Sequence, residues 1–209
     1  KENSIFIFEQ PNFTVGVLSL KFDQIYHEHV SYFTARNIKS ILDYSNLKIL
    51  SLSKNEYHGG SLRTVAAKKK SSLKEFKIDR FINHENKKNI YKLGFYKEMM
   101  KKINLKKKFL LSKLINLSAK GYVISGVGAG AKSNTFLTFY GLNYKIIKFL
   151  TDSSIFKKNK YTPVSRIIIK DDKELIKYKK IACIILSWNI SNLVINKIKK
   201  INKKIKIIY

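Results

Sequence analysis

A glycine loop constrains this sequence more than any other feature, because it stands between a predicted buried strand and a predicted helix. The loop is Gly126-Val127-Gly128-Ala129-Gly130-Ala131, and it follows the apolar stretch Tyr122-Val123-Ile124-Ser125. Its Gly-x-Gly-x-x-Ala spacing is the dinucleotide fingerprint in the alanine-ending form. The first glycine would permit a tight turn, the second would let a phosphate approach the backbone, and free N–H groups at the helix start would face that anion. The loop therefore predicts an α/β unit with a phosphate-binding turn.

Two nearby charged residues fit the same interpretation. Asp152 ends a predicted strand, where an acidic residue can meet a ribose hydroxyl, and Lys132 lies just inside the predicted helix. The alternative is that the small residues only let the helix pack closely on the sheet, which is itself one of the roles of the fingerprint glycines. By itself the loop does not separate a nicotinamide cofactor, a sugar nucleotide and S-adenosylmethionine as ligands.

The last part of the chain alternates between strand-like and helix-like patterns. Gly121 is predicted to cap the preceding helix. The predicted helices lie near 131–141, 172–178 and 190–202, and the predicted strands cover 122–125, 146–151, 166–169, 181–187 and 205–208. Since alternating strands and helices imply a parallel sheet, residues 119–209 are predicted to form a Rossmann-like domain.

The first part of the chain predicts an incomplete sheet. It offers an apolar strand over 5–8 that is predicted to be buried, a helix capped by Thr34, and two strands over 47–53 and 61–66 that are joined through Tyr57-His58-Gly59-Gly60. We therefore expect the chain to start inside a domain that ends near residue 68. Residues 69–118 are predicted to form a basic helical connector, interrupted near Lys106-Lys107-Lys108.

The formal net charge of +28 would ordinarily suggest a nucleic-acid or anionic-membrane partner. Only four of the 42 basic residues are arginine, however, and the lysines are spread along the chain beside abundant isoleucine and asparagine. A nucleic-acid-binding surface more often uses arginine, whose planar fork matches phosphates and guanine edges, interleaved with exposed aromatics. We therefore interpret the charge as a solvated compositional bias and expect no specific nucleic-acid partner.

The single cysteine and the short apolar stretches indicate the compartment. Cys183 lies in the apolar run 181–186, so it is predicted to be a core residue and neither a ligand nor a nucleophile. No apolar stretch approaches the roughly 20 residues that a membrane span needs, and the first residues lack the pattern of a signal peptide. We expect a cytoplasmic location without a membrane partner.

Three of the four histidines fall in two short motifs, Tyr26-His27-Glu28-His29 and His58-Gly59-Gly60-Ser61. In an extended segment, His27 and His29 would share one side. A neutral imidazole can take a proton at neutral pH, and a neighbouring carboxylate or phenol could set its tautomer. The motifs alone leave two alternatives open: a zinc or iron site made of His27, His29 and His58, and a set of structural histidines in loops.

Four segments, taken in order, resemble one family, the sugar C-methyltransferases. The segments are 22–33, His58-Gly59-Gly60-Ser61-Leu62-Arg63, 126–135 and Leu186-Ser187-Trp188-Asn189. Members of that family use S-adenosylmethionine to methylate a carbon of a nucleotide-linked keto-deoxysugar. They combine a zinc-binding N-terminal domain, a central methyltransferase domain and a C-terminal Rossmann-like domain. The resemblance implies an α/β chain in which residues 1–68 form part of a methyltransferase sheet, followed by the connector and the Rossmann-like parallel-sheet domain.

The resemblance also implies roles for single residues. His29 would be the base that removes the proton beside the sugar ketone, with Tyr26 and Glu28 assisting or orienting it, and the enolate carbon would attack the methyl sulfonium. The sugar nucleotide would be bound by His27, His58, Gly60, Lys132, Asn134 and Thr135.

The sequence departs from the family pattern at two places. The four zinc cysteines and the glycine loop for S-adenosylmethionine would lie before residue 1. We therefore expect this chain to hold no zinc and to contain little of the cofactor site. We also expect it to need an N-terminal segment as partner. The usual Pro-Gly step is replaced around Tyr161-Thr162-Pro163-Val164. The alternative function is a non-catalytic α/β module that binds a nucleotide or a polyanion.

Overall fold

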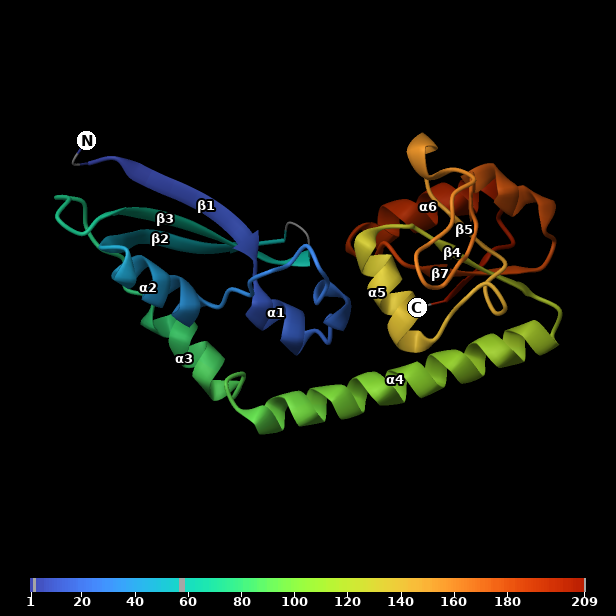
Figure 1. Cartoon of the computed structure of the whole chain (residues 1–209), viewed down its shortest axis with the longest axis horizontal. Coiled ribbons are helices and arrows are strands. Elements are labelled where there is room, and N and C mark those ends of the chain that lie inside the picture. The colour runs from blue at the N-terminus through green and yellow to red at the C-terminus, as the bar shows by residue number, and fades with distance from the viewer. Residues whose placement is uncertain (2, 57–58, 209) are drawn as a thin grey trace. The chain divides into compact units, whose positions relative to one another are not determined.

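The computed structural model describes residues 1, 3–56 and 59–208, which form two compact units. The N-terminal unit comprises residues 1–22 and 28–103, and the C-terminal unit comprises residues 23–27 and 104–209. The fold is α/β, as predicted, with one antiparallel and one parallel sheet (Figure 1). Each unit is described by itself.

The N-terminal unit contains a three-stranded antiparallel sheet in the order β1-β3-β2, with β1 over Ile5–Pro11, β2 over Leu47–Asn55 and β3 over Ser61–Lys68. Helix α2 (Ala35–Tyr44) covers one face, and Thr34 caps it as predicted, because its hydroxyl accepts the Asn37 N–H. Apolar side chains of α2 and the strands form the core between them: Ala35, Ile38, Leu42, Ile49, Leu52, Leu62 and Ala66.

The segment between the first strand and α2 contains a short helix that sequence reasoning did not predict. Helix α1 (Phe13–Leu18) begins directly after β1, and the side chain of Asn12 caps it by accepting the Val15 N–H. A 3₁₀ turn, η1, follows over Phe22–Gln24. The remaining residues up to Thr34 form a loop.

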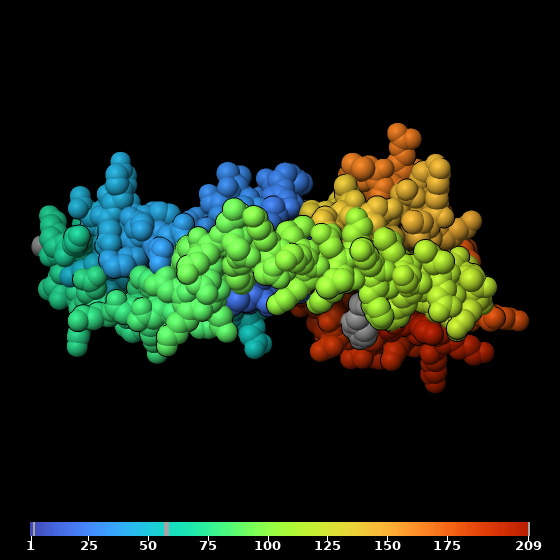
Figure 2. Space-filling model, turned by 90° about the horizontal axis from the view of Figure 1, so that it is seen from below, coloured from blue at the N-terminus to red at the C-terminus, as the bar shows by residue number. Residues whose placement is uncertain are grey.

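Two helices occupy the segment predicted to be a helical connector, namely α3 (Asp79–Lys87) and α4 (Leu93–Ala119). The predicted interruption at 106–108 is wrong, since α4 continues through the three lysines. Buried residues persist on one side of it at Ile103, Leu110, Leu114 and Leu117, and lysine is a good helix former. The outer surface of α4 is visible in Figure 2. Gly121 ends the helix with φ of 76°, and the Tyr122 N–H donates to the Leu117 carbonyl, which confirms the predicted cap.

The C-terminal unit contains the predicted parallel sheet, in the order β6-β5-β4-β7-β8. Its strands are β4 (Val123–Val127), β5 (Phe149–Thr151), β6 (Ile169–Lys170), β7 (Ile181–Ile185) and β8 (Lys206–Ile208). The chain order reverses between β4 and β7, which is the position where open α/β sheets bind ligands. Several strands are shorter than predicted, and the helix predicted over 172–178 is the 3₁₀ helix η4 (Asp172–Lys177).

Helices α5 (Ala131–Tyr140) and α6 (Ser191–Ile201) belong to the same unit as this sheet (Figure 1). Ile195 and Ile198 of α6 pack against buried residues of the strands. Cys183 is one of these, confirming its predicted core position, and burial raises the pKa of its thiol to about 12. Within the described residues, no helix combines the length and apolar character needed to cross a membrane.

Candidate functional site

The histidine motif lies in a loop whose two ends are joined by the backbone of the N-terminal unit. Asn12 and Phe33 form a parallel bridge, and the Phe13 N–H donates to the Phe33 carbonyl at 3.0 Å. At the start of the loop, the Lys21 N–H donates to the Gly16 carbonyl at 2.9 Å. These bonds fix where the loop leaves the N-terminal unit and where it returns.

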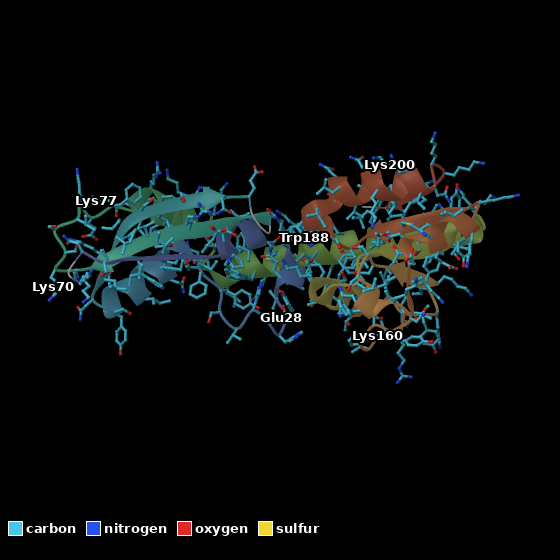
Figure 3. All side chains as sticks on the ribbon, turned by 90° about the horizontal axis from the view of Figure 1, so that it is seen from above. Glu28, Lys70, Lys77, Lys160, Trp188 and Lys200 are labelled. Atoms are coloured by element: carbon cyan, nitrogen blue, oxygen red, sulfur yellow. The ribbon has the colours of Figure 1, made fainter. Side chains whose placement is uncertain are left out.

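The motif itself is a turn, not the extended segment that alternation assumed. Residues 26–28 form a bend and a turn, so the prediction that His27 and His29 point to one side does not apply. The side chains of Tyr26 and His29 are half-buried, whereas those of His27 and Glu28 are exposed, and Figure 3 shows Glu28 on this loop outside the sheet. Tyr26 and His27 belong to the C-terminal unit, and Glu28 and His29 to the N-terminal unit.

Aromatic contacts hold each histidine of the motif. The His29 ring meets the Tyr32 ring edge-on at 6.4 Å between centroids, and Tyr32 in turn packs against Phe13 at 5.1 Å. The His27 ring meets Tyr26 edge-on at 5.8 Å. His29 thus lies beside an aromatic pair that belongs to the base of the loop.

The second motif lies against the base of the same loop. The Gly59 carbonyl accepts a hydrogen bond from the Lys21 ammonium at 2.7 Å, and the Gly60 carbonyl accepts one from the Asn12 N–H at 3.0 Å. Gly60 has φ of 123°, and a Cβ there would come within 2.9 Å of Val15. Gly60 is therefore needed for backbone conformation and close packing, and Lys21 joins the turn at Gly59 to the start of the loop that bears His29. His58 lies outside the described residues.

Metal binding by these histidines finds no geometric support. Within residues 3–56 and 59–208, no three histidine, cysteine, aspartate or glutamate side chains form a group that could hold a metal ion. The proposed third ligand, His58, falls outside those ranges.

The glycine loop of the C-terminal unit differs from the prediction, because its N–H groups already have protein acceptors. The Gly128 N–H donates to the Thr151 carbonyl at 2.8 Å, the Ala129 N–H to the Asp152 carboxylate at 2.8 Å, and the Gly130 N–H to the Ser133 hydroxyl at 3.3 Å. The N–H groups of these three loop residues are thus bonded within the protein, and a carboxylate already lies at the turn.

The glycines of this loop serve close packing. A Cβ on Gly126 would lie 2.6 Å from Leu150, and a Cβ on Gly128 would lie 2.0 Å from the Ser187 hydroxyl oxygen. Gly128 also has φ of 100°, which side-chain-bearing residues rarely adopt. These contacts support the alternative explanation of the loop, in which its small residues allow close packing.

Asp152 fixes this loop through both of its carboxylate oxygens. Burial raises the pKa of Asp152, but hydrogen bonds from the Ser154 and Ala129 N–H groups and from Lys157 outweigh burial, and the net pKa lies below its ordinary value. The ionised carboxylate is therefore the form that the folded loop prefers.

The substrate-binding residues predicted on α5 lie in its first turn, and all three are half-buried: Lys132, Asn134 and Thr135. The Lys132 ammonium lies 5.4 Å from the centre of the Trp188 ring, and the Trp188 indole N–H donates to the buried carboxylate of Asp23. Asn134 carries a buried side-chain oxygen without a hydrogen-bond partner. The C-terminal unit thus gathers Asp23, Lys132 and Trp188, which come from three of the four segments that carried the resemblance.

Sequence reasoning missed Glu85, which is only 3% exposed and organises the start of α2. Its carboxylate accepts the Thr14 hydroxyl at 2.9 Å, the Ala35 N–H at 2.8 Å and the Tyr91 hydroxyl at 2.6 Å. Burial and the Glu85 bond raise the pKa of Tyr91 to about 12. The sequence signal was weak, since Glu85 is one acidic residue in a basic segment and its partners lie far along the chain.

Comparison with known proteins gives two matches. A family model described as the C-methyltransferase C-terminal domain matches residues 56–208. Over 188 residues the chain is 24% identical to a protein named C-methyltransferase NovU from Streptomyces niveus, which corresponds to 90% of this chain and 45% of that protein. The chain therefore spans less than half the length of this curated relative.

Proposed function

The chain belongs to the family defined by the C-methyltransferase C-terminal domain, and on that premise we propose that it takes part in methyl transfer from S-adenosylmethionine to a carbon of a nucleotide-linked keto-deoxysugar in the cytoplasm. One geometric observation carries the proposal beyond family membership. Within the N-terminal unit, Lys21 at the start of the loop that bears His29 donates a hydrogen bond to the Gly59 carbonyl, and Asn12 donates to the Gly60 carbonyl.

In the proposed reaction, His29 acts as a general base. Its neutral imidazole takes the proton from the carbon beside the sugar ketone, and the electron pair of the broken C–H bond forms the enolate. Glu28 and Tyr26 orient the imidazole or stabilise its charged form. The enolate carbon would then take the methyl group, and the methyl–sulfur bond of S-adenosylmethionine would break and leave its electron pair on the sulfur, giving the neutral thioether.

The methyl donor is the part of the reaction that this chain does not supply. S-adenosylmethionine provides an electrophilic methyl group when it is bound. The N-terminal unit has no glycine-rich turn between a strand and a helix, and the glycine loop of the C-terminal unit uses its N–H groups internally. We therefore propose that most of the site for S-adenosylmethionine lies outside the described residues.

The sugar nucleotide is proposed to use the remaining predicted residues. His27, His58 and Gly60 would lie on the side of the reacting sugar, and Lys132, Asn134 and Thr135 on the side of the nucleotide. The unpartnered side-chain oxygen of Asn134 supports this role, because a buried polar atom normally has a hydrogen-bond partner. The alternative is a non-catalytic module that binds a nucleotide at the glycine loop or a polyanion through its lysines. Its nucleotide form is less well supported, since the Asp152 carboxylate lies at that turn.

Hydrogen exchange at the substrate carbon tests the base without requiring methyl transfer. In D₂O, the chain combined with the N-terminal portion of the relative should exchange the proton beside the ketone of a keto-sugar nucleotide, as followed by NMR. His29→Ala should lower the exchange rate by at least about a hundredfold, in line with the contribution of a general base. His84→Ala is the matched control, because His84 is exposed on α3 outside both motifs. Equal exchange rates for the two variants would remove His29 from the proposed mechanism.

A further inference from the structure

The C-terminal unit contains a pocket at the carboxyl ends of β4 and β5, beside the point where the strand order reverses. Its volume is about 200 Å³. That exceeds the roughly 150 Å³ of an engineered cavity that holds benzene, and it is below the roughly 300 Å³ at which pockets for drug-sized ligands begin. The pocket therefore has room for one six-membered ring and its substituents.

Two buried polar atoms of the pocket lining have no partner within the part of the chain that the structure describes. The Thr151 residue is fully buried and its hydroxyl makes no hydrogen bond, and Asp172 is 8% exposed with an unbonded carboxylate oxygen, Oδ1. A buried polar group without a hydrogen-bond partner destabilises the folded state. A ligand with hydrogen-bond donors would satisfy both acceptors.

The charges of the lining are balanced. The other oxygen of Asp172 pairs with the Lys197 ammonium at 2.5 Å, and Asp152 pairs with Lys157 at 3.2 Å. A phosphate would have to approach two carboxylates and a turn whose N–H groups are bonded already. These contacts disfavour an anion and favour an uncharged group.

One wall of the pocket is aliphatic. It is formed by Ile190 and by Leu193 and Val194 of α6, and Leu193 is 71% exposed. Exposed aliphatic side chains beside a few convergent polar groups are typical of a site that takes the face of a ring. Gly128 lines the same pocket, and its missing side chain leaves room for the Ser187 hydroxyl.

We propose that this pocket binds an uncharged ring that donates hydrogen bonds to Thr151 and Asp172, with its face against α6. A nucleobase and a sugar ring share this chemistry, so the experiment must separate them. The site does not depend on the proposed methyl transfer, because all of its residues belong to the C-terminal unit. If His29 proved not to catalyse proton exchange at the substrate carbon, the proposal for this pocket would still stand.

Titration of the full chain tests the proposal, with binding followed by NMR or calorimetry. The probes are thymidine, adenosine, methyl glucoside and inorganic pyrophosphate at one ionic strength. We expect a nucleoside or the glucoside to bind and pyrophosphate to show no binding at the pocket residues. The ring that binds more tightly shows whether the pocket takes a nucleobase or a sugar. Failure of all the rings to bind at millimolar concentration would mean that the pocket holds water only, and it would overturn the proposal.

Two buried threonines give a matched pair of variants. Thr151→Val removes the pocket hydroxyl, and Thr64→Val removes an equally buried and equally unpartnered hydroxyl in the core of the N-terminal unit. Neither should lower the unfolding temperature, since each deletes an unsatisfied polar atom without changing shape. Thr151→Val should weaken ring binding by about two- to tenfold, the range of one neutral hydrogen bond, and Thr64→Val should leave it unchanged. The same affinity in both variants contradicts the proposal.

A second pair covers the carboxylate. Asp172→Asn replaces the buried carboxylate with an amide, which removes the charge and one of the two acceptor oxygens. We expect it to weaken ring binding about tenfold or more. Asp171→Asn makes the same change at the neighbouring exposed carboxylate, where asparagine can still cap η4, and it should not alter binding. Unchanged affinity of Asp172→Asn contradicts the assigned acceptor.

Discussion

Both units use a carboxylate to hold the backbone that leads into a helix, but they differ in what surrounds it. In the N-terminal unit, Glu85 accepts the Ala35 N–H at the start of α2 and two hydroxyl groups, and it is fully enclosed. In the C-terminal unit, Asp152 accepts the Ala129 N–H before α5, pairs with a lysine, and borders a pocket. The first is a closed structural clamp, whereas the second stands next to polar atoms that still lack partners. The same device thus serves stability in one unit and borders a candidate ligand site in the other.

Removal of the Glu85 carboxylate should have the largest effect. Glu85→Ala leaves the buried donors of Thr14 and Ala35 without this acceptor and removes the part-buried bond to Tyr91, so we expect the free energy of unfolding of the N-terminal unit to fall by about 4 kcal/mol. Glu85→Gln keeps one acceptor oxygen and should lose less. Hydrogen exchange of the β2 and β3 amides measures this loss.

The lone tryptophan tells whether the clamp acts locally. Trp188 belongs to the C-terminal unit, so its fluorescence in a urea titration reports that unit. We expect the fluorescence midpoint of Glu85→Ala to stay within error of the wild type. A matching drop in both signals would show that the comparison between separate clamps is wrong.

A side chain on Gly128 should have the next largest effect, this time in the C-terminal unit. Gly128→Ala places a methyl group 2.0 Å from the Ser187 hydroxyl at a φ of 100°, and we expect a loss of about 2–3 kcal/mol. Trp188 fluorescence during urea unfolding measures it. The matched control is Gly130→Ala, because the nearest atom to that Cβ is 4.0 Å away and φ there is ordinary. If both variants lose equal stability, the packing role of Gly128 is refuted.

The two carboxylates explain which features could be predicted from sequence. The parallel sheet and the Gly121 cap followed from apolar runs and a local glycine, which need no distant partner. The bonds of Glu85 to Thr14 and of Asp152 to Ala129 join residues 71 and 23 positions apart, so no local pattern indicates them. The same limit applies to the glycine loop, whose spacing could not tell a phosphate turn from a turn closed by its own carboxylate. The break predicted in α4 failed for a different reason, because a polar run on a helix surface does not interrupt burial on the other face.

Changing pH should weaken the units through different side chains. The folded-state pKa of Asp152 is lowered, so its stabilisation is present above its unfolded value near 3.9 and is lost from the C-terminal unit as pH falls through the folded value. The folded-state pKa of Tyr91 is raised to about 12, so its contribution to the N-terminal unit is intact below pH 10 and is lost as pH rises toward 12. The pKa of the buried Cys183 thiol is also raised to about 12, so alkali should weaken the C-terminal unit as well.

One variant for acid and one for alkali test which side chains cause these changes in stability with pH. Asp152→Asn should reduce the fall in the Trp188 unfolding midpoint between pH 6 and pH 3, and Tyr91→Phe should reduce the loss of N-terminal structure between pH 9 and pH 11.5. Circular dichroism and fluorescence, recorded on the same samples, follow the two units. An Asp152→Asn chain with the full acid dependence of the wild type would show that other carboxylates govern the C-terminal unit.

The smallest expected change in stability lies on β1, where the sheets of the two units also differ. All five residues of β7 are buried, whereas Ile5, Phe6 and Ile7 of the edge strand β1 are each more than half exposed. Exposed apolar edge strands promote association through their unpaired backbone groups. Because Ile7 is exposed while Phe8 packs on the core, Ile7→Lys should change the free energy of unfolding by no more than about 0.5 kcal/mol. It should also reduce self-association of the isolated chain in sedimentation velocity, whereas Phe8→Lys should destabilise the N-terminal unit. Unaltered association of Ile7→Lys would show that the open edge is not the adhesive surface, and that the two sheets differ in burial alone.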